Sequence, residues 1–442
     1  MMNLTKYFDL PEDDSAIIQR IAVSPQPITD LAKYETEEGC KLLEQKHKKV
    51  YVVTPQIVRI IRRIFGIARA HLNSAYASEW MYKECCYIKN LIPRDPWLPT
   101  ALVGLGGTGK TQLIMAMERL CVTGGAKIEL EGMPAYPLEP LWIMTMSMGS
   151  SLNALLMPFL AEVKGGNVLI VAAKIAFTNG VSLLVLDESQ FITSTQAGHA
   201  KAAKTLMEAT YIGPPFLFCA NYTMINKLEK RPQQERDRLL SNIIPLMPEA
   251  RGSEAYRDTF DGQLRVFGNA VASDSAVTAD KYSEPMHNFV YGIDRKTAIL
   301  LQHAWRICRA EGAEILNFGH IERAYHSELF TSHRVEVEFL KEQSIQKRKL
   351  RDDLWCNFVP PMPCNVHQVK SFDDEKKKRA NMALSRSALT KDEREAYDYL
   401  TSEVAKRKRT TGTVVNLTKT DKSLNALQTA GAEMMEQFKS EK

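Results

Sequence analysis

The chain has 442 residues and a net charge of +5, with 45% hydrophobic and 25% charged residues. This composition is ordinary for a soluble globular protein of roughly two or three domains, and the mild charge permits a polyanionic partner without requiring one. Eight scattered cysteines argue against a disulfide framework and fit a reducing compartment. No apolar run approaches the roughly 20 residues of a membrane-spanning helix, and no signal peptide is recognisable. We therefore expect a cytoplasmic protein with no membrane partner.

Residues 1–95 are predicted to form a helical N-terminal region. Its clearest helix lies in "TPQIVRIIRRIFGIARAHL", where Thr54 suits a cap, Pro55 suits the first turn, and apolar residues recur at helical spacing. The same helix carries four arginines, which form either a solvated polar face or a strip that contacts nucleic acid phosphates or a neighbouring subunit. They are Arg59, Arg62, Arg63 and Arg69.

Residues 96–288 are predicted to form a nucleotide-binding core of alternating strands and helices. Four apolar segments are typical of buried strands: "TALVGL", "PLWIMTMSM", "VSLLVLDES" and "PPFLFCAN". Helical segments such as "TQLIMAMERL" and "AAKTLMEATYI" separate them, which favours an α/β fold with a parallel sheet covered by helices. Residues 251–288 are polar, and we expect an insertion or loop there around one short strand, "LRVFG".

Residues 289–353 are predicted to form a helical lid domain, beginning with "RKTAILLQHAWRICRAEG". A proline-rich break, "NFVPPMPCNV", comes next. Residues 354–442 contain basic runs and few large apolar residues, so they cannot bury much surface, and we expect a largely flexible tail. The tail is either a solubilising end or a segment that docks a protein partner or contacts DNA.

Residues Gly104 to Thr111 match the phosphate-loop pattern G-x-x-x-x-G-K-[ST] between a predicted strand and a predicted helix. Loop amides and the helix N-terminus can form an anion nest for a nucleotide's phosphates. Lys110 is expected to span the β- and γ-phosphates, and Thr111 to place its hydroxyl on Mg²⁺. The other predicted nucleotide-binding residues are Gly104, Gly106, Gly107, Thr108, Gly109 and Gln112.

An acid pair, Asp187 and Glu188, ends the third predicted strand. A carboxylate at this edge of the sheet can hold the magnesium ion, which is the role predicted for Asp187. Glu188 is then placed to polarise the attacking water. The alternative is a pair of acids at a helix N-terminus, where the helix dipole favours negative charge.

Asn221 ends the fourth predicted strand, where it either contacts the water or γ-phosphate or caps the next helix. Arg231, Arg236 and Arg238 follow. We select Arg236 as the candidate that reaches a neighbouring subunit's γ-phosphate and stabilises transition-state charge, the alternative for each arginine being a solvated charge. Arg295, at the start of the lid, is predicted to contact the nucleotide.

This order of motifs resembles that of the AAA+ ATPases. Over roughly residues 50–345, the "GSSL" segment, the "DESQF" segment with Gln190 and Phe191, and the lid resemble TnsC, the target-selection ATPase of Tn-seven-like transposons, related to TniB and MuB. The fourth strand departs from that family, because it ends in "CAN" and not in a Gly-Thr-type sequence.

The resemblance implies an ATPase that uses ATP and Mg²⁺ and acts as a regulator, not a processive motor. Its subunits would form a hexameric or heptameric ring, or a helical filament, on duplex DNA. The assembly would receive a TniQ/TnsD-type target selector and recruit a TnsA/TnsB-type transposase, and hydrolysis would disassemble it. Candidates for the DNA contact are Lys164, Lys174 and the arginines of the N-terminal region.

Two other functions are compatible with the same motifs. One is a different AAA+ or STAND-like ATPase, such as a helicase loader or a defence switch. The other is a scaffold that binds nucleotide without hydrolysing it, although such a site has no need of Glu188.

Overall fold

The computed structural model describes residues 5–88, 97–121, 123–147, 150–160, 167–193, 198–273 and 275–362. The chain divides into two units, Met1–Asn365 and Val366–Lys442, and all described residues belong to the first. Most of the expected tail, residues 363–442, and the candidate Lys164 lie outside the described residues. Among the helices that are described, none has the length and apolarity that crossing a membrane requires.

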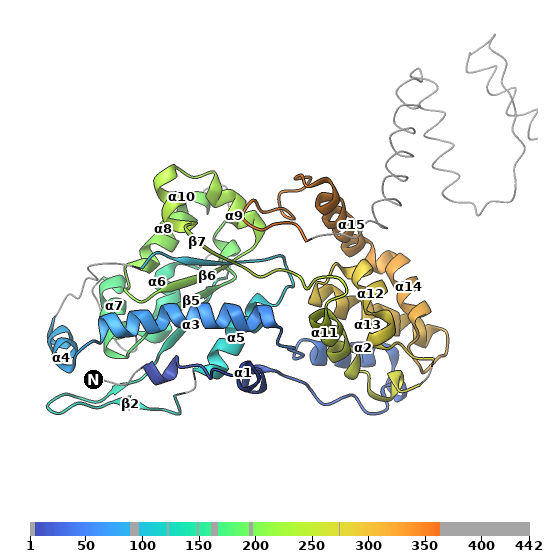
Figure 1. Cartoon of the computed structure of the whole chain (residues 1–442), viewed down its shortest axis with the longest axis horizontal. Helices are drawn as coiled ribbons and strands as arrows, with labels where there is room; N and C mark the ends of the chain where they lie inside the picture. The colour runs from blue at the N-terminus through green and yellow to red at the C-terminus, as the bar shows by residue number, and fades with distance from the viewer. Residues whose placement is uncertain are drawn as a thin grey trace, which may run out of the picture. The chain divides into compact units, whose positions relative to one another are not determined.

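A parallel sheet of five strands, in the order β4-β5-β6-β1-β7, forms the centre of the core (Figure 1). All residues of β1, β5 and β6 are buried, as expected for parallel strands covered on both faces. The four predicted strands are present, and β7 is an additional one. The strands are β1 (Thr100–Val103), β4 (Leu141–Thr145), β5 (Leu183–Asp187), β6 (Phe216–Ala220) and β7 (Asn242–Pro245).

Alternate residues of each strand pack into different apolar clusters on the two faces of the sheet. In β5, Leu184 and Leu186 belong to one cluster, whereas Leu183 and Val185 belong to the other. The first cluster contains residues of α6 (Leu152–Leu156), α7 (Val168–Thr178), α8 (Gly198–Thr210) and α9 (Tyr222–Glu229). The second contains residues of α1 (Asp14–Ile21), α3 (Pro55–Ala75), α4 (Glu79–Tyr87), α5 (Lys110–Leu120) and the hairpin strand β2 (Lys127–Ile128), which pairs with β3 (Tyr136–Pro137).

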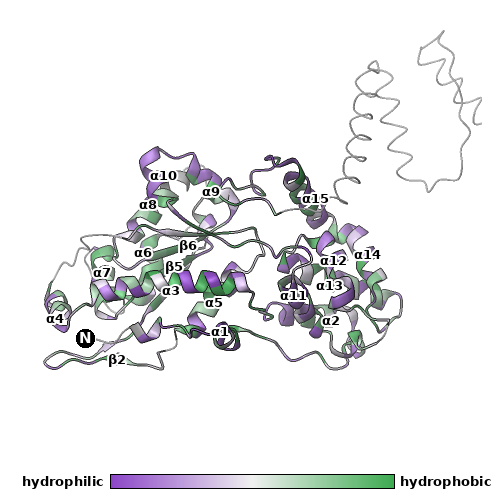
Figure 2. Ribbon diagram, viewed as in Figure 1, coloured by the Kyte–Doolittle hydropathy of each residue, from purple (hydrophilic) through white to green (hydrophobic). Residues whose placement is uncertain are grey.

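The predicted helix α3 is amphipathic, with both hydrophilic and hydrophobic residues along its length (Figure 2). Its arginines have partners within the chain. Arg62 Nη2 donates to Asp14 Oδ1 at 2.6 Å, and Arg63 Nη2 donates to Asn242 Oδ1 at 2.6 Å. Arg69 pairs with Asp9, and Arg59 donates to the Pro55 carbonyl. Arg62 and Arg69 therefore attach the preceding segment to α3 and Arg63 attaches β7, whereas the bond of Arg59 lies within α3.

Lys174, the other described candidate for DNA contact, has a structural role. Its ammonium donates to the carbonyl oxygens of Cys85, Cys86 and Ile88, with Nζ–O distances of 2.8 Å to Cys85 and Ile88. These carbonyls belong to the C-terminal end of α4, where backbone acceptors lack partners within the helix. The lysine thus caps α4 and fixes it to α7.

The lid consists of α11 (Glu254–Arg265), α12 (Ala279–Val290), α13 (Asp294–Ala310), α14 (Phe318–His326) and α15 (Thr331–Gln346). The expectation of a loop and a strand within 251–288 is therefore wrong, because α11 and α12 occupy much of that stretch. Tyr256, Phe260 and Leu264 recur every fourth residue and bury one side of α11. Because these helices share an apolar cluster with α13 and α14, a domain boundary at residue 289 falls inside one packed unit.

A helix from the N-terminal region, α2 (Thr36–His47), packs against α13 of the lid. Cys40 and Leu43 lie in the same cluster as Trp305. A Cβ on Gly39 would lie 3.4 Å from Trp305 Nε1, so the glycine allows the two helices to approach closely. The expected N-terminal region therefore contributes to two different cores, the lid through α2 and the sheet through α3.

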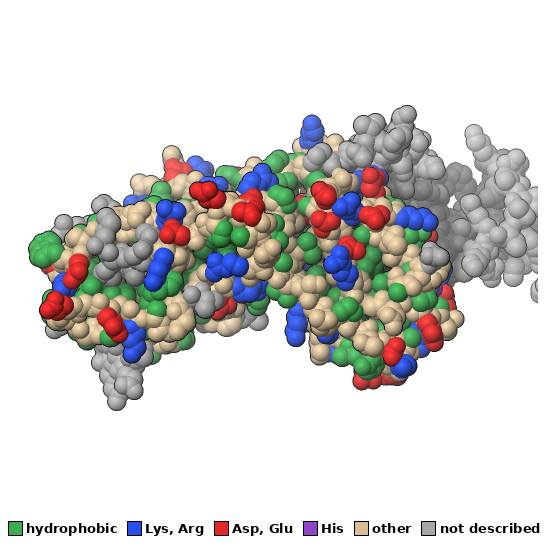
Figure 3. All heavy atoms as spheres, turned by 60° about the horizontal axis from the view of Figure 1, so that its bottom comes forward, with side chains coloured by type: hydrophobic (Ala, Val, Ile, Leu, Met, Phe, Trp, Pro, Cys, Tyr) green, Lys and Arg blue, Asp and Glu red, His purple; other side chains and the backbone are tan. Residues whose placement is uncertain are grey.

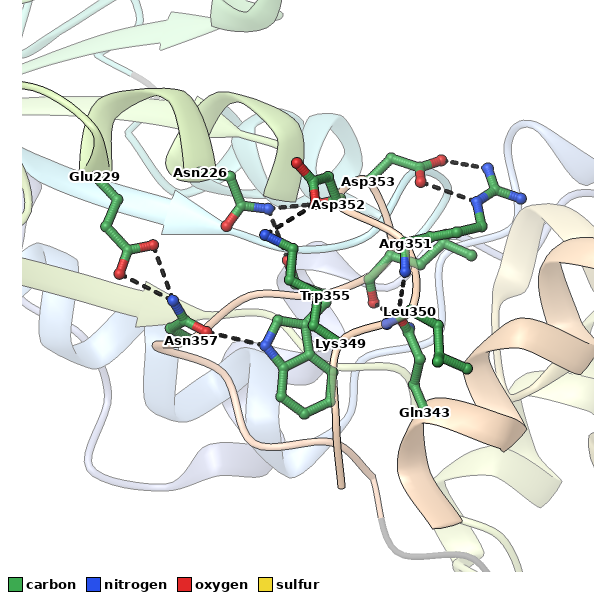
Figure 4. Close-up of polar contacts among 11 residues, drawn as sticks. Asn226, Glu229, Gln343, Lys349, Leu350, Arg351, Asp352, Asp353, Trp355 and Asn357 are labelled. Atoms are coloured by element: carbon green, nitrogen blue, oxygen red, sulfur yellow. Dashed lines mark hydrogen bonds and ion pairs between the residues drawn. The ribbon is translucent and has the colours of Figure 1, made fainter. Parts of the chain in front are cut away.

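Residues 347–362, called the strap here, leave α15 and return to the core (Figure 4). Cys356, Val359 and Met362 of the strap are buried in the cluster that also contains residues of β1 and β6. The proline-rich start of the expected tail is consequently packed and not flexible. These three buried side chains anchor the segment, although most of its other residues are exposed or partly exposed.

We expect Leu43→Ala to destabilise the lid, because Leu43 is fully buried between α2 and the lid helices. The free energy of unfolding should fall by about 3 kcal/mol, typical of a buried leucine truncated to alanine. Denaturant unfolding followed by far-ultraviolet circular dichroism measures this change. Lys41→Ala, on the exposed side of α2, should change the value by less than about 0.5 kcal/mol. Equal effects of the two substitutions would contradict the packing of α2 with the lid.

Candidate functional site

The loop between β1 and α5 has the backbone shape of an anion nest. Gly107 and Gly109 have φ angles of 88° and 90°, a region that disfavours side chains. Gly104 is required for a different reason, since a Cβ there would lie 2.5 Å from the carbonyl oxygen of Leu246. The loop ends at the N-terminus of α5, where the first amides have no partner within the helix. Phosphate oxygens are the natural acceptors for such amides.

Three further loop residues predicted to bind nucleotide differ in how they contribute. The Thr108 hydroxyl is buried and donates to the Leu105 carbonyl at 3.0 Å, so it shapes the loop. A Cβ on Gly106 would meet nothing within 4 Å, which leaves space over the loop at that position. The Gln112 side chain donates to the Lys48 carbonyl at 2.6 Å, and contact of this residue with phosphates stays a prediction.

The lysine and threonine of the motif meet the acid-bearing strand at the edge of the sheet. Lys110 Nζ donates to the carbonyl oxygens of Gly104 and Leu105, both at 2.8 Å. Thr111 Oγ1 donates to Asp187 Oδ2 at 2.8 Å, and Asp187 is 4% exposed. Burial lowers the pKa of the Lys110 ammonium, and nearby acidic side chains oppose that shift. The two halves of the predicted site are therefore in direct contact.

These residues fit a magnesium nucleotide. The Thr111 hydroxyl and the Asp187 carboxylate supply the hard oxygen ligands that Mg²⁺ prefers. The buried ammonium of Lys110 and the amides of the loop supply positive charge and donors for a polyphosphate.

Glu188 follows β5 in a conformation that non-glycine residues rarely adopt, with φ of 54°. Its backbone amide donates to Asp187 Oδ1 at 2.8 Å, and its carboxylate accepts a hydrogen bond from Gln190 Nε2. The Ser189 hydroxyl donates to the Cys219 carbonyl of β6. The turn is therefore tied to the neighbouring strand, and Gln190 orients the acid predicted to act on water. Strained backbone held in this way is frequent at active sites.

Asn221 is the N-cap of α9, which is one of the two roles that the sequence allows for it. Its Oδ1 accepts a hydrogen bond from the Met224 amide at 2.9 Å. This bond uses only the oxygen of the side-chain amide, and the residue lies at the carboxyl end of β6, between β1 and β5. A contact from the NH₂ group to the γ-phosphate stays a prediction.

The three arginines after β6 lie on or next to α10 (Gln233–Leu239). Arg231 forms an ion pair with Glu235 at 2.8 Å. Arg236 lies 3.6 Å from Asp237 and its side chain is 42% exposed, so it is accessible to another molecule. Arg238 lines a surface cavity. The role of Arg236 toward a neighbouring subunit stays a prediction.

The structure brings Arg295 to the phosphate loop. Its backbone amide donates to the Gly107 carbonyl at 3.3 Å, and a Cβ on Gly107 would lie 2.7 Å from Arg295 Cβ. The glycine thus allows the start of the lid to touch the loop. Its side chain is exposed, and contact with nucleotide stays a prediction.

No protein-family model matches the chain, and no curated protein matches it. Solved structures do match. The ORC2 protein of Aeropyrum pernix is 15% identical with a TM-score of 0.39, and the match covers 72% of this chain and 85% of that one. Domain III of the Thermotoga maritima replication initiation protein DnaA is 13% identical with a TM-score of 0.33, covering 62% and 92%. A katanin structure is 12% identical with a TM-score of 0.32, covering 72% and 93%.

In this chain, β6 lies between the phosphate-loop strand and the acid-bearing strand, a helical lid follows the last strand, and the lid contacts the loop. The chain has an AAA+ P-loop NTPase fold. Within it, the phosphate loop, the acid pair and the lid meet at the carboxyl edge of the sheet.

Beside the loop of this AAA+ core is a cavity that the sequence did not indicate. Gln56 forms two hydrogen bonds with the Met247 backbone, accepting from its amide at 2.9 Å and donating to its carbonyl at 3.0 Å. The Thr54 hydroxyl is buried there without a hydrogen-bond partner among the described residues. Five separate stretches of the chain supply the lining, so no single motif marks it. It is lined by Val52, Thr54, Gln56, Ile57, Thr108, Leu246, Met247, Pro248, Glu249, Thr259, Gly292 and Asp294.

Asp294, the first residue of α13, has a shifted pKa. Burial, together with the negative charge of Glu249, raises the pKa of its carboxyl to about 7. An ionisation near neutral pH therefore lies next to the phosphate loop, at the N-terminus of α13.

We expect Asp294→Asn to stabilise the protein increasingly as pH rises. Between the pKa of the unfolded carboxyl, 3.8, and about 7, the folded state holds a proton that the unfolded state releases, so unfolding becomes easier with rising pH. The advantage of the variant should grow by roughly 1–3 kcal/mol between about pH 5 and about pH 8.

Thermal unfolding of variant and parent at both pH values measures that growth. The quantity to compare is the stability of the variant minus that of the parent at each pH. Buried His47 and His287 have pKa values lowered to about 4, so they make both proteins more stable as pH rises toward the pKa of unfolded histidine, and the subtraction removes their effect. Asp258→Asn, on the exposed side of α11, should give a difference that does not vary with pH. A pH-independent effect of Asp294→Asn would exclude the raised pKa.

Proposed function

We propose that the chain is an ATPase that binds ATP with Mg²⁺ and hydrolyses it to ADP and phosphate. The observation that carries this proposal is the 2.8 Å contact between the Thr111 hydroxyl and the Asp187 carboxylate at the mouth of the phosphate loop. A nucleotide-bound Mg²⁺, held by these two side chains, would neutralise phosphate charge. The Lys110 ammonium would then donate to the β- and γ-phosphates in place of the carbonyl oxygens of Gly104 and Leu105.

Glu188 is the proposed base. Its carboxylate accepts a proton from a water whose oxygen bonds to the γ-phosphorus, and the bond from that phosphorus to the oxygen bridging to the β-phosphorus breaks, leaving ADP. Gln190 holds the carboxylate by donating to one of its oxygens, which leaves the other for water. Asn221 is the proposed γ-phosphate contact, through its NH₂ group. Arg295 would contact the phosphates from the lid.

We expect Glu188→Gln to reduce ATP turnover by about 100-fold or more, the usual range for loss of a general base. ATP affinity should stay near that of the parent, because the loop and Lys110 are unchanged. Steady-state phosphate release and equilibrium binding of a fluorescent ATP analogue measure the two quantities. The matched control is Glu118→Gln on the exposed side of α5. Unchanged turnover in Glu188→Gln would favour a different base.

We further propose that the ATPase regulates DNA transposition. This proposal is supported by the sequence resemblance to TnsC over roughly residues 50–345. ATP at each subunit interface would link assembly to nucleotide state, since the γ-phosphate completes the contact with the neighbour's Arg236. The hexameric or heptameric ring, or helical filament, would enclose target duplex DNA and receive the TniQ/TnsD-type selector. It would then recruit the TnsA/TnsB-type transposase, with hydrolysis driving disassembly.

The surface charge constrains where DNA would bind. On the face shown in Figure 3, Lys and Arg side chains alternate with Asp and Glu. The N-terminal arginines and Lys174 have partners within the chain, which reduces their availability to phosphates. We therefore propose that DNA meets a patch created by assembly, with an affinity that falls steeply as salt rises.

The alternatives differ in what the assembled protein does. A helicase loader or defence switch of AAA+ or STAND type would use the same ATP site with other partners. A non-hydrolysing scaffold is disfavoured by the contact between Gln190 and Glu188, which orients an acid that binding alone does not need.

We expect electron microscopy with duplex DNA and a non-hydrolysable ATP analogue to show rings or filaments on the DNA. Arg236→Ala should abolish the assemblies, and should lower DNA-dependent ATP turnover about 1000-fold if this arginine acts as the finger in trans. Arg265→Ala, an exposed arginine of α11, is the control. Absence of assemblies in the parent protein would remove the transposition proposal and leave the ATPase proposal standing. Normal assembly of Arg236→Ala would transfer the role to Arg238.

A further inference from the structure

The strap, residues 347–362, begins with a turn built around one buried glutamine of α15. Gln343 is 2% exposed. Its Oε1 accepts hydrogen bonds from the amides of Leu350 and Arg351 at 3.0 and 2.8 Å, and its Nε2 donates to the Leu354 carbonyl at 3.1 Å (Figure 4). A single side chain therefore satisfies three backbone groups of the strap and fixes it to the lid.

The strap is fixed to the core by α9, the helix that begins at the carboxyl end of β6. Asn226 Nδ2 donates to the carbonyls of Asp352 and Trp355 at 2.5 and 2.9 Å. Asn357 Nδ2 donates to both carboxylate oxygens of Glu229 at 2.9 and 3.0 Å. Figure 4 shows these contacts on one side of the strap and those of α15 on the other.

Apolar contacts continue the attachment toward the phosphate loop. Cys356, Val359 and Met362 are 3%, 6% and 5% exposed, and they share a cluster with Val337 and Leu340 of α15 and with residues of β1. The same strap residues line a cavity with residues of the loop, of α9 and of the connection between α12 and α13. Those lining residues are Leu105, Tyr222 and Tyr291. The strap therefore joins lid and core directly beside the candidate nucleotide site.

We propose that the strap holds the lid over the nucleotide site, so that the first residues of α13 stay against the phosphate loop. This inference depends on the proposed ATPase function. Gln343 and Asn226 are positioning residues, since they act through the strap and not on the nucleotide. The group that they position is the start of α13, where the Arg295 amide donates to the Gly107 carbonyl. Detaching the strap frees the lid to turn about residues 246–253, the segment that joins β7 to α11.

The test detaches the strap from either side, with Asn226→Ala or Gln343→Ala in the full chain. In Asn226→Ala, where the acceptor Gln343 is intact, hydrogen exchange at the amides of Leu350 and Arg351 reports whether the strap is released. In variants whose strap is released, the dissociation constant of a fluorescent ATP analogue should rise about tenfold, which is the effect of losing roughly one contact between lid and nucleotide. KM for ATP should rise similarly, whereas kcat should change less than threefold, because the acid pair is untouched. Lys349→Ala, which breaks an ion pair with Asp352 inside the strap, should leave binding unchanged.

A double mutant separates positioning from general damage. In an Arg295→Ala background, Asn226→Ala should weaken binding less than twofold further, because both act through the lid. Fast hydrogen exchange at the strap amides with unchanged nucleotide affinity would overturn the proposal. So would a double mutant in which Arg295→Ala and Asn226→Ala weaken nucleotide binding independently of each other. If Asn226→Ala and Gln343→Ala do not fold, the test uses Asn357→Ala, which removes an exposed contact between the strap and Glu229. This variant should weaken nucleotide binding measurably but less than tenfold, and unchanged binding would refute the proposal. Failure of the parent chain to bind the analogue at all would instead reject the proposed ATPase function.

Discussion

The contact between Thr111 and Asp187 depends on the register of the whole sheet. Thr111 belongs to the helix after β1, and Asp187 ends β5, but these strands are not neighbours, because β6 lies between them. Their side chains meet at 2.8 Å only because all three strands are parallel and end at the same edge. The paired positions Val103 and Ala220 of β1 and β6 show this alignment directly. Any shift of β6 would separate the phosphate loop from the acid that completes it.

Much of the core could be predicted from the sequence, because its signals are local. The buried strands are continuous apolar runs, and the phosphate loop is a fixed pattern of glycines with one lysine and one hydroxyl residue. β7 was missed because it presents two isoleucines between polar and proline neighbours. The sequence does not predict α11, because its regularly spaced apolar residues, such as Tyr256, Phe260 and Leu264, lie among mostly polar neighbours. The polar composition of residues 251–288 by itself is typical of a loop.

The parts of the site that could not be predicted come from segments far apart in the sequence. The cavity beside the loop combines Thr54, Met247 and Asp294, none of which belongs to a motif. Gln112 and Asn221 show a second limit. The sequence places them beside the loop and after β6, but the side-chain nitrogen of Gln112 donates to the Lys48 carbonyl and the side-chain oxygen of Asn221 accepts from the Met224 amide. Position in a motif therefore predicts a residue's neighbourhood better than it predicts which atom faces the ligand.

Among the described residues, several contacts attach the lid to the rest of the chain, and they determine what has to move when the lid opens. α2 packs against α13 from the N-terminal side, the strap joins α15 to α9, and the first residues of α13 touch the phosphate loop. A lid held only by its covalent connection would lose nucleotide contacts by simple rotation. With α2 and the strap in place, rotation requires breaking buried hydrogen bonds and apolar contacts, so a closed lid is largely preformed. Preformed geometry lowers the ordering cost of binding. Any opening would have to release the strap and turn the lid about residues 246–253, which join β7 to α11.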